Sequence, residues 1–186
     1  SGAVAWKMKE ESFLKDVSQI DNLKLRVSFG YTGNNNIAPY SSQSALNSQT
    51  YYDWDGASAN GFLPGALSNS NLTWERTREW NFGVDFGFFG NRITGEINYY
   101  DRLSKDLLMN RKLATPTGWA NMIDNVGSVS NKGVEIQLKT VNIDTGDFKW
   151  ETNFIFSTNK NKIVELYGEK KDDVANRWFI GQPVNV

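Results

Sequence analysis

Neither cysteine nor histidine occurs among the 186 residues of the chain. These absences exclude disulfides, thiolate nucleophiles, imidazole bases and the commonest zinc ligands from the chain. No apolar run approaches the ~20 residues that a membrane-spanning helix needs. The 20 basic and 21 acidic residues nearly cancel, and no basic stretch is dense. Nucleic acid is therefore not expected as a partner.

Period-two alternation of apolar and polar residues is the dominant pattern that is present. It occurs over residues 23–31, 80–88, 93–99, 134–138 and 150–156, and a shorter stretch over 4–8 shows it too. Successive side chains of a strand point to opposite faces, so each segment predicts a strand with one apolar and one polar face. Ile155 interrupts the polar row of the last segment. The expected fold class is all-β, with antiparallel up-and-down strands.

The connections between these strands alternate in length. Residues 89–92 and 142–148 predict tight turns, whereas Thr32 to Glu75 and Ser104 to Asn125 are long and without a predicted element. Short turns at one end and long loops at the other are typical of outer-membrane barrels, which expose the loops outside the cell. Lys170 to Asp173 is expected to be an exposed charged tip.

Aromatic residues gather beside both kinds of connection. Those next to short connections are Trp6, Phe88, Phe89 and Trp150, and those next to long ones are Tyr31, Trp74, Trp80 and Tyr99. Rings at both strand ends are typical of the two interfacial girdles of a transmembrane β-barrel. The residues between the girdles that are expected to face lipid are Leu25, Val27, Phe82, Val84, Phe86, Ile97, Val134, Ile136, Leu138 and Phe154.

Several local motifs resemble one family. Residues 23–34, LKLRVSFGYTGN, resemble the "LKLRxSYGxTGN" signature of SusC/RagA-type TonB-dependent outer-membrane transporters. Further matching stretches follow in the family's order: 69–75 (NSNLTWE), 81–87 (NFGVDFG), 91–95 (NRITG), 99–101 (YYD), 105–108 (KDLL), 125–127 (NVG) and 131–135 (NKGVE). The resemblance covers nearly the whole chain.

This resemblance implies a segment of a multi-pass β-barrel in the outer membrane of Bacteroidetes-type bacteria. Such barrels have about 22 strands around a plug. The chain, residues 1–186, is expected to be a partial barrel, because five strands and part of a sixth leave edges that lipid cannot satisfy. The implied function is import of oligosaccharides or peptides, not catalysis. The implied partners are a SusD-type surface lipoprotein, and TonB through a plug region that this sequence lacks.

Two sets of candidate site residues follow from these patterns. The polar strand face is expected to line the lumen, with Arg26, Asn81, Asp85, Glu96, Asn98, Glu135 and Gln137. The first long connection is rich in aromatic residues, among them Tyr40 and Phe62, and Tyr51, Tyr52 and Trp54 are expected to contact cargo or the lipoprotein. Neither a metal nor another cofactor is expected: Asp53, Asp55 and Ser58 resemble only half of a calcium loop.

Two alternatives compete with the transporter hypothesis. A secreted β-sandwich that binds carbohydrate would explain the alternation and the exposed rings, but not the alternating connection lengths. A glycosidase needs two carboxylates at ~5–10 Å, and Asp85, Glu96, Glu135 and Glu151 could supply them. Carboxylates on neighbouring strands often reach this spacing by chance. The spacing therefore does not by itself indicate an enzyme, and no catalytic activity is expected.

Overall fold

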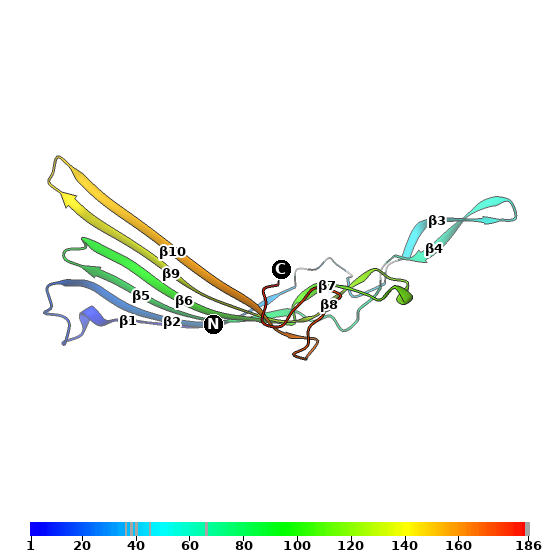
Figure 1. Ribbon diagram of the computed structural model, residues 1–186, viewed down its shortest axis with the longest axis horizontal. Coiled ribbons are helices and arrows are strands. Elements are labelled where there is room, and N and C mark those ends of the chain that lie inside the picture. Colours follow the sequence, from blue (N-terminus) through cyan, green and yellow to red (C-terminus); the bar gives the residue numbers. More distant parts are fainter. Residues whose placement is uncertain (36, 38, 40, 45, 66, 185–186) are drawn as a thin grey trace. The chain divides into compact units, whose positions relative to one another are not determined.

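The chain is almost entirely β-structure in the computed structural model, which describes residues 1–35, 37, 39, 41–44, 46–65 and 67–184 (Figure 1). Six strands form one sheet in the order β1-β2-β5-β6-β9-β10, and β3-β4 and β7-β8 form separate two-stranded sheets. The strands are β1 (Gly2–Lys7), β2 (Ile20–Asn34), β3 (Leu46–Trp54), β4 (Ala57–Pro64), β5 (Glu75–Phe88), β6 (Ile93–Lys105), β7 (Leu108–Lys112), β8 (Asn121–Asn125), β9 (Gly127–Asp144) and β10 (Lys149–Leu166).

The neighbours in the main sheet follow chain order, as expected of up-and-down strands. β1 and β2 pair antiparallel, with Val4 opposite Val27 and Trp6 opposite Leu25. Between β5 and β6, Glu79 contacts Arg102 and Phe82 contacts Tyr99, so one strand runs up as the other runs down. This order confirms the predicted fold class, although the strands are longer than the alternating segments that indicated them.

Tight turns close the β5–β6 and β9–β10 pairs. Phe89, Gly90 and Asn91 all have positive φ, and the Thr145 amide donates to the Phe148 carbonyl at 3.1 Å, next to Gly146 with φ 86°. Figure 1 shows both turns at the end of the sheet where residues 8–19 join β1 to β2. The predicted arrangement of the two tight turns at a common end is therefore confirmed.

Each face of the main sheet has its own chemistry. Rings of neighbouring strands meet on one face, where the Phe29 and Trp80 centroids are 4.4 Å apart and those of Phe82 and Tyr99 are 6.3 Å apart. Many of these apolar side chains are exposed in this chain; Phe82, for example, is 43% exposed. The opposite face carries charged and amide side chains. The sheet therefore has an apolar side that is not covered by the described residues.

The expectation that both long connections lack structure is wrong. The first contains the β3–β4 hairpin, in which Asp53 pairs with Ser58 and Trp54 with Ala57. Its turn residues, Asp55 and Gly56, have φ of 53° and 75°, as a type I′ turn requires. The second connection contains the β7–β8 hairpin, with Leu108 opposite Asn125. Each long connection is therefore built around its own two-stranded unit.

The chain divides into two compact units. One comprises residues 1–32, 77–103 and 129–162, which form most of the main sheet; the other comprises residues 33–76, 104–128 and 163–186. Among the described residues, the buried apolar side chains lie in the second unit: Val126, Ile163, Leu166 and Trp178. After β10 the chain folds back, and the Gly181 amide donates to the Ile163 carbonyl at 2.8 Å.

The predicted exposed tip at residues 170–173 is confirmed for Lys170, Lys171 and Asp172, which are exposed, but not for Asp173. The Asp173 carboxylate accepts hydrogen bonds from the Tyr167 hydroxyl and the Asn176 amide side chain, each at 2.8 Å. Burial raises the pKa of the Tyr167 hydroxyl above its usual range, and the bond to Asp173 adds to this. For Asp173, burial acts to raise the pKa, but the bonds from Tyr167 and Asn176 outweigh it and hold the pKa below its usual value.

Candidate functional site

An ion-paired cluster occupies the polar face where β2, β5 and β6 lie side by side. The Asp85 carboxylate is 2.7 Å from Lys24 Nζ and 2.6 Å from Arg26 Nη2. Arg26 also donates to Asn98 Oδ1 at 3.1 Å and lies 3.4 Å from Glu96 Oε2. Alternate residues of a strand share a face, and this is why the three strands bring these side chains together. The cluster joins four of the candidate lumen residues with Lys24, which the alternation of residues 23–31 places on the same polar face.

Gly83 makes room for this cluster. A Cβ at this position would lie 2.8 Å from Asn98 Oδ1 and 3.0 Å from the Arg26 guanidinium carbon. The missing side chain therefore lets the Arg26 guanidinium lie across β5 and reach β6. A similar relation holds at Gly133 on β9, whose backbone is covered by the Tyr100 ring. Glycine at these positions leaves room for long side chains from neighbouring strands to lie across the backbone.

The remaining predicted lumen residues lie outside the cluster. Asn81 is half-buried and lines a hollow of about 270 Å³ with Arg26 and Ser28. Glu135 and Gln137 are exposed on β9, and the structure does not bring them to Arg26. The polar face thus has an ion-paired part on β2, β5 and β6 and an exposed part on β9.

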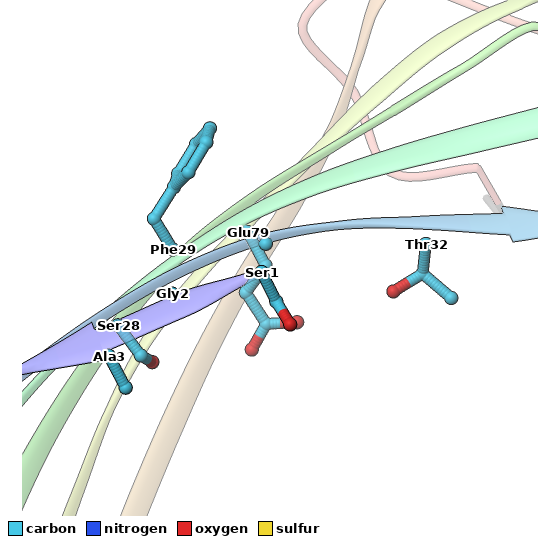
Figure 2. Close-up of a pocket in the computed structure, with 8 residues that line it drawn as sticks. Ser1, Gly2, Ala3, Ser28, Phe29, Thr32 and Glu79 are labelled. Atoms are coloured by element: carbon cyan, nitrogen blue, oxygen red, sulfur yellow. The ribbon is translucent and has the colours of Figure 1, made fainter.

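A second hollow, of about 340 Å³, lies along β1 and β2. Figure 2 shows the Phe29 ring on one side of β2 and the side chains of Ser28, Thr32 and Glu79 on the other. The Glu79 carboxylate is paired with Arg102 at 2.9 Å. Alternation along the strands therefore places the Phe29 ring and these polar side chains on opposite faces of the sheet.

The β3–β4 hairpin carries the aromatic residues predicted as a contact site, but it divides them between two faces. Tyr52 and Trp54 share one face and meet edge to face, with centroids 6.3 Å apart. The Tyr52 ring lies over Gly61, where an added Cβ would be 3.1 Å from the ring. Tyr51 points to the other face, as alternation requires. All three are exposed, by 52–69%; the predicted Tyr40 lies outside the described residues.

Asparagine side chains tie the two long connections together. The Asn125 amide group donates to the carbonyls of Thr73 and Asp106 at 2.9 and 2.7 Å and accepts from the Thr73 amide at 2.8 Å. Asn69 donates to the Ile123 carbonyl at 3.1 Å. These contacts involve two motifs of the family resemblance, 69–75 and 125–127, whose structural role the sequence alone did not reveal.

No group of three or more acidic, histidine or cysteine residues that could hold a metal ion occurs in the described part of the chain. Searched over the same residues, the structure contains no helix that is both long and apolar enough to cross a membrane.

Comparison with known proteins agrees with this architecture. A family model described as "TonB dependent receptor-like, beta-barrel" matches residues 2–185. The chain is 38% identical over 179 residues to TonB-dependent receptor P26 of Formosa agariphila, covering 96% of this chain and 18% of that protein. It is 39% identical over 176 residues to TonB-dependent receptor SusC of Bacteroides thetaiotaomicron, covering 92% of this chain and 17% of that protein.

A solved structure titled as the RagAB peptide transporter aligns with a TM-score of 0.84 and 27% identity, covering 97% of this chain and 20% of that chain. The chain thus spans a fifth or less of the length of the relatives that it matches. The match of fold and sequence rules out the β-sandwich alternative. The chain therefore belongs to the TonB-dependent receptor family, of which it represents a portion of the β-barrel.

Proposed function

We propose that this chain is part of an outer-membrane importer, in which the main sheet crosses the membrane. The observation that carries the proposal is the contrast between the two sheet faces: rings and aliphatic side chains on one, the Arg26–Asp85 cluster on the other. Lipid accepts the first kind of surface and a water-filled or plugged lumen accepts the second. The chain contributes to transport and carries out no catalysis.

The polar face is proposed to line the lumen. Lys24 and Arg26 balance the charges of Asp85 and Glu96, and Asn98 accepts from Arg26, so this part of the wall is already neutralised. Glu135 and Gln137 are exposed and are free to meet the plug or passing cargo. Contact with TonB would belong to parts of the whole protein outside this chain.

The long connections are proposed to lie outside the cell, and the β3–β4 hairpin to contact cargo or a SusD-type lipoprotein. Its exposed rings offer a large contact area with little conformational entropy to lose. The Tyr52–Trp54 face is the better candidate, because the small residues Ala57, Ala59 and Gly61 beside it leave the rings accessible. The similarity to a structure titled as a peptide transporter supports a peptide as cargo, and an oligosaccharide is the other cargo that the family resemblance implies.

The proposal is tested in the full-length transporter by separating the two hairpin faces. Tyr52→Ala with Trp54→Ala is expected to reduce uptake or lipoprotein capture about thirtyfold or more, because a central aromatic anchor contributes roughly 2 kcal/mol. Tyr51→Ala should have a smaller effect. Phe13→Ala is the matched control, since Phe13 is a similarly exposed ring (60%) in the connection at the short-turn end.

Barrel folding should survive in all three variants, because no strand pairing of the main sheet is touched; heat-modifiable migration on gels measures this. If a combined Tyr51, Tyr52 and Trp54 alanine variant imports cargo and captures lipoprotein like the unmodified protein, the hairpin is a solvated connection and its proposed role is wrong.

A further inference from the structure

Arg78 lies at the end of the apolar row of β5. It lies two residues before Trp80 on the same strand, so it shares the face on which Trp80 meets Phe29 and Phe82. Its side chain is half-buried, and its Nε is buried without a hydrogen-bond partner. Arg78 forms no ion pair among the described residues. A positive charge on a half-buried side chain of an apolar face is costly unless an anion balances it.

A second cation lies close by. Lys132 on β9 pairs with Asp101 on β6 at 2.6 Å, and Arg78 and Tyr99 are near enough to act electrostatically on its ammonium group. Arg78, Lys132 and Asp101 together carry two positive charges and one negative charge. Among the described residues, no second anion balances the remaining positive charge.

The position of the cluster along the strand suggests what supplies that charge. From Trp80 to Phe88 the apolar row of β5 covers eight residue steps, or about 26 Å of strand at ~3.3 Å each. This is close to the apolar band of a tilted barrel strand. Arg78 lies two residues before Trp80 on the same face, toward the long connections. This is the level at which phosphate groups of lipids meet a barrel.

We propose that Arg78 and Lys132 bind the phosphate of an anionic lipid in the outer leaflet, with Trp80 and Tyr99 packing beside it. The guanidinium nitrogens that are not buried supply N–H donors to phosphate oxygens, and the phosphate balances the excess positive charge. Lys132 adds a point charge while it keeps Asp101 as its second partner. This inference rests on the proposed orientation of the apolar face toward lipid.

The test measures lipid binding in the purified full-length transporter by native mass spectrometry in detergent, with diphosphorylated lipid A as the probe. Arg78→Gln is expected to weaken lipid A binding about fivefold, and Arg78→Lys by less, since one cation near anionic lipid contributes roughly a factor of five. Arg102→Gln is the matched control, because Arg102 lies on the opposite face and is paired with Glu79.

Three results would overturn the inference: equal lipid A binding by Arg78→Gln and the unmodified protein, an equal loss in Arg102→Gln, or full displacement of lipid A by millimolar inorganic phosphate. The last result would indicate a general anion site. Failure of the proposed function has a different signature, because the unmodified protein itself would then not insert into lipid vesicles.

Discussion

At the scale of single residues, the glycines of the main sheet differ in what surrounds their missing side chains. A Cβ at Gly83 meets the ends of two flexible side chains, Arg26 and Asn98, whereas a Cβ at Gly95 meets the Gln137 carbonyl and the Phe86 ring. A Cβ at Gly2 meets nothing within 4 Å. A side-chain end can move aside at the cost of a hydrogen bond, but backbone cannot.

Alanine substitution should therefore rank these positions. Gly83→Ala is expected to cost about 1 kcal/mol through loss of the Arg26–Asn98 bond, and Gly95→Ala about 1–3 kcal/mol or more through overpacking. Gly2→Ala is the neutral control. Guanidinium unfolding of the full-length barrel, followed by tryptophan fluorescence, gives the three free energies. An equal cost at Gly2 and Gly95 would contradict the close contacts.

The Asp173 carboxylate gives the returning segment a dependence on pH. Its pKa is lower in the folded chain than in the unfolded chain, where a carboxyl of this kind titrates near ~3.9. Its stabilising effect is therefore complete above that unfolded value and is lost as the pH falls through the folded value. Hydrogen-exchange protection of the Asn176 amide, which donates to Asp173 Oδ1, should decrease in this acidic window.

Asp173→Asn is the control for this prediction. The variant should show reduced protection at neutral pH and no further acid-dependent loss beyond the intrinsic change in exchange rate. Unchanged protection of the Asn176 amide in both proteins from pH 7 to pH 2 would show that the carboxylate does not hold the segment.

At the scale of elements, the sequence predicted the faces well and the register poorly. Alternation is local, so the shared polarity of Arg26, Asp85 and Glu96 could be read from each strand separately. The ion pairs between them could not, because β2 and β5 are separated by residues 35–74 and their register is set by tertiary contacts. Arg78 was missed although it is the charged residue beside the first ring of the apolar row of β5, a signal that the sequence does contain.

The β3–β4 hairpin was also missed, although Asp55-Gly56 is a strong turn signal. Its flanking strands do not alternate cleanly: Tyr51 and Tyr52 are adjacent rings on opposite faces. Both faces of the hairpin carry exposed rings, so the segment has no single apolar side to indicate a strand. The long connection therefore looked like a loop.

Asn125 is the residue whose loss should loosen the long connections. Asn125→Ala removes three hydrogen bonds between residues 73, 106 and 125 and is expected to cost about 1–3 kcal/mol locally. The Thr73 amide should lose hydrogen-exchange protection. Asn110→Ala is the matched control, an exposed asparagine of the same hairpin. Equal hydrogen-exchange protection of the Thr73 amide in both variants would show that the hydrogen bonds of Asn125 are not needed to hold the two connections together.

At the scale of the whole molecule, the two faces predict opposite tolerance to charge. Val84→Lys, in the middle of the apolar face, should destabilise the barrel in lipid vesicles by ~2–4 kcal/mol. Gln137→Lys, exposed on the polar face, should change stability little. Unfolding in guanidinium from vesicles of defined lipid measures both. Comparable costs would contradict the orientation proposed for the sheet.

The alternation of short and long connections also has a kinetic consequence. Joining β5 to β6 closes a loop of residues 89–92, whereas joining β2 to β5 closes a loop of residues 35–74, ten times longer. Loop-closure entropy rises with the logarithm of length, which makes the second closure about 2 kcal/mol less favourable. The β5–β6 and β9–β10 hairpins should form first, on the microsecond scale of hairpin formation. The sheet then grows by docking of preformed pairs, two strands at a time.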